Sequence, residues 1–90
     1  MQFEGQEKIP LALQKQMAGA PDQTMFLLLH VSETGPRQLA DIERAGYAVH
    51  QQTSIIPCYA VSGPGRGLQA LAKEAWLVRV EEDSAVHTMQ

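Results

Sequence analysis

The apolar and polar positions of the chain repeat with two different periods, one typical of strands and one of helices. A period of two runs through residues 24–32, where apolar side chains fall on both faces. This predicts a central strand that is covered on both sides or nearly so. The same period over residues 76–81 predicts a half-buried strand, with Trp76, Val78 and Val80 on one face.

Two further segments read as strands with weaker patterns. Residues 47–52 alternate only weakly, and their polar side chains suit the edge of a sheet. Residues 58–61 follow Pro57, a residue that cannot donate to an interior ladder and is tolerated at a strand start. We therefore expect a turn over residues 53–55 between these two strands.

Helical spacing of apolar residues predicts helices over residues 9–18, 35–45 and 68–75. Thr34 is the expected N-cap of the second helix, and Gly46 stands where a left-handed C-cap belongs. The first helix is short and needs packing against the rest of the chain to persist.

The resulting order is one helix followed by β-α-β-β-α-β. This order predicts an α+β, ferredoxin-like sandwich in which two helices cover one face of a four-stranded antiparallel sheet, with a short extra N-terminal helix. We expect a flexible N-terminus over residues 1–8, a single domain over residues 9–83 and a flexible C-terminal tail over residues 84–90.

Such a sandwich leaves one sheet face uncovered, yet the first strand is apolar on both sides. Either the N-terminal helix covers part of that face, or the exposed apolar patch marks a partner site. Phe26 and Leu28 are the candidate contact residues, and each such side chain that a partner buries contributes ~1.5–3 kcal/mol.

Composition excludes several function classes. The chain has 44% hydrophobic residues, a net charge of −3 and seven scattered Lys and Arg, so we expect a globular domain with no nucleic-acid partner. No apolar run approaches the ~20 residues of a membrane span, and no signal peptide is visible at the start. A single cysteine excludes an internal disulfide, and no Cys/His spacing indicates a metal or cofactor.

Two groups of residues could form a catalytic or an anion-binding site, but we prefer a structural role for each. Cys58 with His30 or His50 would make a thiol and base, yet a cysteine in a central strand is by default a small buried residue. The glycine-rich residues 63–67 with Arg66 would make an anion nest, but they lack the lysine of a phosphate loop and read as a strand-to-helix turn. We therefore predict no catalytic residues and no enzyme.

The end of the chain combines an acidic cluster with a polar tail. Glu81, Glu82 and Asp83 stand where the last strand should leave the sheet, and residues 84–90 have few apolar groups. This arrangement is suited to presenting a peptide to a partner, or it is a frayed end.

The sequence V-R-V-E-E-D-S-A-V-H-T-M of residues 78–89 resembles the ending of the inhibitory prodomains of subtilisin-like serine proteases. The predicted strand and helix order, the A-G-Y-A-V of residues 45–49 and the lead-in K-I-P-L-A-L-Q-K-Q-M-A-G-A are also similar to that family. The resemblance covers roughly residues 8–89.

The resemblance implies a partner, the catalytic domain of a subtilisin-like serine protease, and a mode of binding. The open sheet face would pack on two protease helices, whose N-termini Glu81, Glu82 or Asp83 would cap. The tail would lie in the substrate cleft as an added strand. Its residues would be Val86 and Met89 in two apolar subsites, with His87 and Thr88 between them.

The sequence departs from the family because no catalytic domain follows Gln90, one residue beyond Met89. We therefore expect a stand-alone inhibitor and folding assistant, an excised prodomain, or a descendant with another role. The alternative from a different class is an interaction domain that forms a homodimer by burying its open face against a second copy. A more distant alternative is a small-ligand regulatory domain or an acylphosphatase-like enzyme.

Overall fold

The computed structural model describes residues 3–53 and 55–83. Its elements follow the predicted order of an extra N-terminal helix and then β-α-β-β-α-β. They are η1 (Gln6–Lys8), α1 (Leu11–Gly19), β1 (Thr24–Val31), α2 (Pro36–Arg44), β2 (Ala48–Thr53), β3 (Cys58–Pro64), α3 (Gly67–Ala72) and β4 (Leu77–Glu82).

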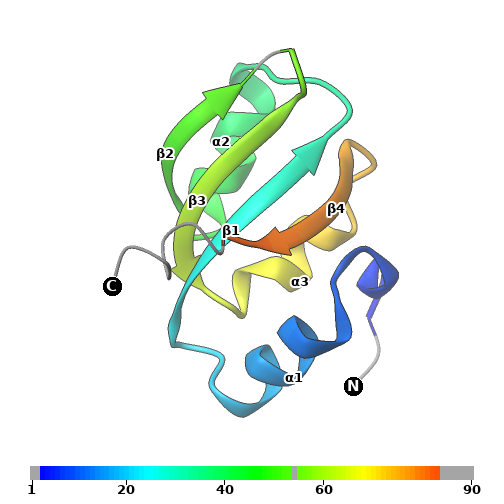
Figure 1. Cartoon of the computed structure of the whole chain (residues 1–90), viewed down its shortest axis with the longest axis vertical. Coiled ribbons are helices and arrows are strands. Elements are labelled where there is room, and N and C mark those ends of the chain that lie inside the picture. The colour runs from blue at the N-terminus through cyan, green and yellow to red at the C-terminus, as the bar shows by residue number, and fades with distance from the viewer. Residues whose placement is uncertain (1–2, 54, 84–90) are drawn as a thin grey trace.

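The strands form one four-stranded sheet in the order β2-β3-β1-β4, and every neighbouring pair is antiparallel. Each β-α-β unit steps over one strand, so the two units interlock, and β1 and β3 become the central strands. Both α2 and α3 lie behind the sheet in Figure 1, which looks onto the uncovered face. The predicted fold class, an α+β ferredoxin-like sandwich, is confirmed.

The core lies between the helices and the covered face of the sheet. Alternate residues of β1 are buried there, as the period of two requires. The buried apolar residues form a single cluster: Ile9, Leu13, Met17, Met25, Leu27, Leu29, Val31, Ile42, Tyr47, Tyr59, Val61, Leu68, Leu71, Ala72, Leu77 and Val80.

The helix α1 joins this core rather than covering the open face. Its Leu13 and Met17 are buried, and a Cβ built on Gly65 would lie 3.1 Å from Met17 Cγ and 2.7 Å from Met25 Sδ. Met25 belongs to the covered face, so α1 extends the helical layer. Of the two options that the sequence left open, the structure supports the second, since no element within residues 3–53 and 55–83 covers the other face.

Residues 3–8 include the 3-10 helix η1 and make specific contacts with the rest of the fold. Phe3 packs against the core cluster, and Lys8 Nζ donates a hydrogen bond to the carbonyl of Glu74 (2.9 Å). Gly5 has a positive φ of 83° and approaches Ala72 so closely that a Cβ would lie 2.0 Å from its carbonyl oxygen. A single aromatic residue and a glycine therefore hold a segment that is otherwise polar.

The glycine-rich connection before α3 makes room for the side chain of Tyr47. The strand β3 runs on to Pro64, three residues further than predicted, and the ring of Tyr47 lies against Gly63 near the end of this strand and Gly67 at the start of α3. A Cβ on Gly63 would lie 2.5 Å from Tyr47 Cδ1, and one on Gly67 would lie 2.7 Å from Tyr47 Cε2. The glycines thus admit Tyr47 to the core, where its hydroxyl donates to the carbonyl of Pro64 (2.6 Å).

Two local expectations are wrong. The N-cap of α2 is Gly35 and not Thr34, and the Tyr59 hydroxyl lies 3.0 Å from Gly35 N and 3.2 Å from Gly35 O. In β4 the predicted alternation fails at Val78, which is 53% exposed. The register between β1 and β4 shifts by one residue at this point, so Leu77 takes the buried position.

Candidate functional site

The uncovered face of the sheet is apolar at its centre. Phe26, Leu28 and His30 are the alternate residues of β1 that point away from the core, and all three are half-buried. In the antiparallel register Leu28 stands opposite Ala60 of β3, on one side, and Glu81 of β4 on the other. Both sequence-predicted contact residues, Phe26 and Leu28, therefore lie on this face.

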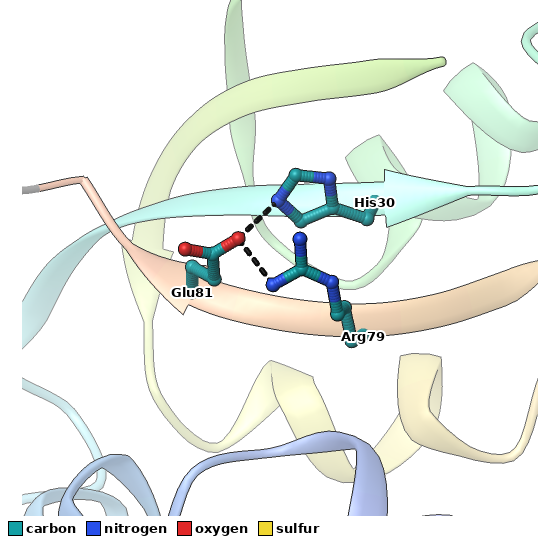
Figure 2. Close-up of polar contacts among 3 residues, drawn as sticks. All are labelled: His30, Arg79 and Glu81. Atoms are coloured by element: carbon teal, nitrogen blue, oxygen red, sulfur yellow. Dashed lines mark hydrogen bonds and ion pairs between the residues drawn. The ribbon is translucent and has the colours of Figure 1, made fainter. Parts of the chain in front are cut away.

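A charged network borders the apolar centre on the β4 side. Figure 2 shows the Glu81 carboxylate between His30 and Arg79. His30 Nε2 lies 2.7 Å from Glu81 Oε1 and approaches it as an ion pair rather than as an aligned hydrogen bond. Arg79 Nη1 contacts the same carboxylate oxygen. Two cationic groups thus converge on one atom of Glu81 when His30 is protonated.

The three acidic residues of the predicted cluster do not form one patch. Glu81 and Glu82 belong to β4, and Asp83 continues its ladder by donating its backbone N–H to the carbonyl of Phe26 (2.9 Å). Alternation along the strand places Asp83 on the open face with Glu81. Glu82 points the other way and lines a small cavity together with Leu13 of α1.

The thiol of Cys58 shares the open face, since Cys58 stands opposite His30 in the register. Partial burial raises the pKa of Cys58 above its ordinary value, and the carboxylates of Glu81 and Asp83 raise it further, while Arg79 lowers it. The neutral thiol is therefore favoured, which is the opposite of what an activated nucleophile requires. His50 is directed elsewhere, with Nε2 2.7 Å from the Ser62 hydroxyl.

The anion nest and metal binding are the other sites to be considered. Arg66, the charge of the proposed anion nest, is ion-paired with Asp22 in the turn after α1. Its backbone N–H donates to the carbonyl of Pro21 (3.0 Å). Over residues 3–53 and 55–83, no three His, Cys, Asp or Glu side chains come together as a metal-binding group.

The tail residues predicted to enter a substrate cleft, Val86, His87, Thr88 and Met89, lie outside the described residues. The structure shows where the chain leaves β4. That point is Asp83, beside Phe26 at one end of the open face. Any segment that follows Asp83 begins next to the apolar centre.

Sequence reasoning missed the network of His30, Arg79 and Glu81. Arg79 and Glu81 are two apart in a predicted strand and were expected on one face, so part of the signal was present. The contact with His30 depends on the pairing of β1 with β4 at a particular register, which the sequence does not reveal.

Comparison of the chain with protein-family models, with curated proteins and with solved structures finds no match. In the part of the chain that the structure describes, no helix has the length and apolar character needed to cross a bilayer.

Proposed function

We propose that this chain is a protease-binding module that inhibits a subtilisin-like serine protease, assists its folding, or does both. It acts as a ligand of the protease and not as an enzyme. The observation that carries the proposal is the uncovered sheet face, with Phe26 and Leu28 at its centre and Glu81 and Asp83 at its border.

This face has the composition of a binding surface. Specific interfaces combine an apolar centre with a polar rim, and here the half-buried Phe26 and Leu28 are bordered by the charges of β4. Two protease helices laid across β1 would cover both side chains. The sequence resemblance to inhibitory prodomains supports a protease as the partner that supplies those helices.

The carboxylates supply the second contact. A carboxylate at a helix N-terminus is stabilised by the exposed N–H groups and the helix dipole, by ~0.3–1 kcal/mol and more when partly buried. One oxygen of Glu81 is already engaged by His30 and Arg79. We therefore assign the capping role to Asp83 first, and regard Glu81 as the residue that positions the charges around it.

The third contact is the segment after Asp83. It would enter the substrate cleft in extended form and pair with the enzyme's strands, with Val86 and Met89 in apolar subsites. Inhibition then follows from occupancy of the cleft, while the open face holds the module in place.

An inhibition assay with purified subtilisin tests the proposal. We expect the full chain to inhibit, and removal of residues 85–90 to abolish or strongly reduce inhibition. Phe26→Lys and Leu28→Lys should each raise the inhibition constant by at least ~10-fold, since they bury a charge at the centre of the interface. Leu11→Lys is the matched control, because Leu11 is 64% exposed on α1, away from the open face.

Each negative result has a distinct meaning. Inhibition that survives removal of residues 85–90 contradicts the cleft mechanism but not protease binding. A full chain that neither inhibits subtilisin nor binds it contradicts the proposal and favours the alternative of an interaction domain.

A further inference from the structure

The sheet has two edges, and other parts of the described chain flank only one of them. The segment η1 packs against β4 and is held there by Lys8. At the opposite edge, β2 pairs with β3 alone, and no backbone group of Ala48–Thr53 bonds to any other described residue. An edge strand with unpaired N–H and C=O groups is a template for a further strand.

The hairpin formed by β2 and β3 carries no charge that would block such pairing. None of the seven Lys and Arg or the ten Asp and Glu lies within residues 45–65. Edge strands are commonly protected by charged side chains, but β2 presents the exposed amides of Gln51 and Gln52 instead. A primary amide both donates and accepts hydrogen bonds, so these side chains are complementary to their own copies.

The tip of the same hairpin exposes two large apolar side chains. Ile55 is 99% exposed and Ile56 is 69% exposed, the two highest values among the strongly exposed large hydrophobic residues. The hydroxyl of Thr53 donates to the carbonyl of Ile56 (2.7 Å) and so holds the turn that presents them. Adjacent exposed isoleucines of this kind mark a contact surface.

We propose that the outer edge of β2 and the tip at Ile55 and Ile56 form a homodimer interface. Two copies pair β2 antiparallel about a two-fold axis, and their sheets become one continuous sheet. The partner is a second copy of the chain. Two copies, each with a net charge of −3, repel each other over most of their surface, but no Lys, Arg, Asp or Glu lies in this hairpin, so they can meet here without repulsion between like charges.

The register follows from the shape of β2. The pairing with β3 is irregular between Val49 and Gln51, so the axis lies in the regular second half of the strand and places Gln52 opposite Gln52 of the other copy. Ile55 and Ile56 of one copy then lie beside the start of β2 in the other, where Ala48 is small and exposed. The tip of each copy is thereby covered by the start of β2 in its partner.

This interface is separate from the open face and does not rest on protease binding. It also differs from a dimer that buries the open face, because Phe26 and Leu28 stay accessible. A dimeric inhibitor would present two open faces on one sheet and so bind two protease molecules.

Sedimentation equilibrium of the full chain over a wide concentration range tests the proposal. We expect a monomer–dimer equilibrium, and we expect Gln52→Lys to raise the dimer dissociation constant by at least ~10-fold, since like charges then meet near the axis. Ile55→Ser should weaken the dimer as well. Gln23→Lys and Leu11→Ser are the matched controls at exposed positions outside the hairpin, and they should leave the constant unchanged.

A charge-swap experiment tests the register. Chains carrying Gln52→Lys and chains carrying Gln52→Glu should each dimerise poorly alone and associate when mixed, because opposite charges then face each other across the axis. Backbone amides of Ala48–Thr53 should gain hydrogen-exchange protection as the concentration of the unmodified chain rises.

Three outcomes overturn the proposal. One is a chain that sediments as a monomer at every concentration. The second is a dimer whose constant neither hairpin substitution changes, and the third is a dimer that Phe26→Lys disrupts while Gln52→Lys does not. The first two outcomes leave inhibition of subtilisin untouched, whereas the third favours a dimer through the open face. The subtilisin assay is a separate measurement, so failure of this inference and failure of the proposed function are told apart.

Discussion

At the scale of single residues, Glu81 interacts with three other residues of the sheet. It binds His30 and Arg79 with one oxygen and acts electrostatically on Cys58. The sequence grouped Glu81 with its two acidic neighbours, but strand alternation separates their directions. A residue that was expected to be free for a partner is thus partly engaged within the chain.

The pKa of the Cys58 thiol reports on the negative charge of Glu81. Burial is the main cause of its raised pKa, and Glu81 is the next. Glu81→Gln removes the negative charge, so the pKa of Cys58 should fall and the thiolate fraction at mildly alkaline pH should rise. We expect faster alkylation by iodoacetamide across that pH range, with the rate profile displaced to lower pH.

The matched control for alkylation is Glu74→Gln, a carboxylate that does not act on Cys58. Its rate profile should coincide with that of the unmodified chain. A profile for Glu81→Gln that stays in place, or moves to higher pH, contradicts the electrostatic assignment.

At the scale of elements, α1 persists because it is packed against the rest of the molecule. Nine residues are too few for a stable isolated helix, and α1 contributes Leu13 and Met17 to the common core. The period of its apolar residues predicted the helix, while the contact with Met25 and Gly65 decided where it lies.

Two substitutions within α1 separate packing from helix propensity. Met17→Ala should lower the free energy of unfolding by ~2–5 kcal/mol, since it leaves a cavity beside Met25. Leu11→Ala should change it by less than ~0.5 kcal/mol, because Leu11 is largely exposed. Urea denaturation followed by circular dichroism measures both, and equal effects of the two changes would contradict the docking of α1.

At the scale of the whole molecule, the sandwich has one face closed by helices and one that the described residues leave uncovered (Figure 1). The two faces of β1 have different tasks. Leu27 and Leu29 are fully buried and stabilise the fold, whereas Phe26 and Leu28 remain partly accessible. Binding and folding are therefore carried by adjacent residues of one strand.

Neighbouring residues of β1 allow this division to be tested. Leu27→Ala should lower the free energy of unfolding by ~2–5 kcal/mol because it opens a cavity in the core. Leu28→Lys should leave the chain folded, since the lysine can extend its charged end into water, while it weakens protease inhibition. Thermal unfolding and the subtilisin assay on the same samples check both statements, and a Leu28→Lys chain that unfolds would contradict them.

Much of the fold could be predicted from local pattern. The periods of two and 3.6 identified the four strands and three α-helices of the described residues, and their order led to the ferredoxin-like class. The errors lie where a distant contact overrides the local pattern. The Tyr59 hydroxyl contacts Gly35, which is the N-cap of α2 in place of Thr34, and the register shift opposite His30 and Val31 turns Val78 outward.

The sequence by itself determined which residues are apolar, how they repeat and hence the type and order of the elements, because these depend on neighbours in the chain. Only the tertiary structure decided which side of the sheet α1 joins, which carboxylates share a face and that His30 meets Glu81. Such relations depend on strand register and helix docking, which join residues far apart in sequence and are set by packing rather than by local preference.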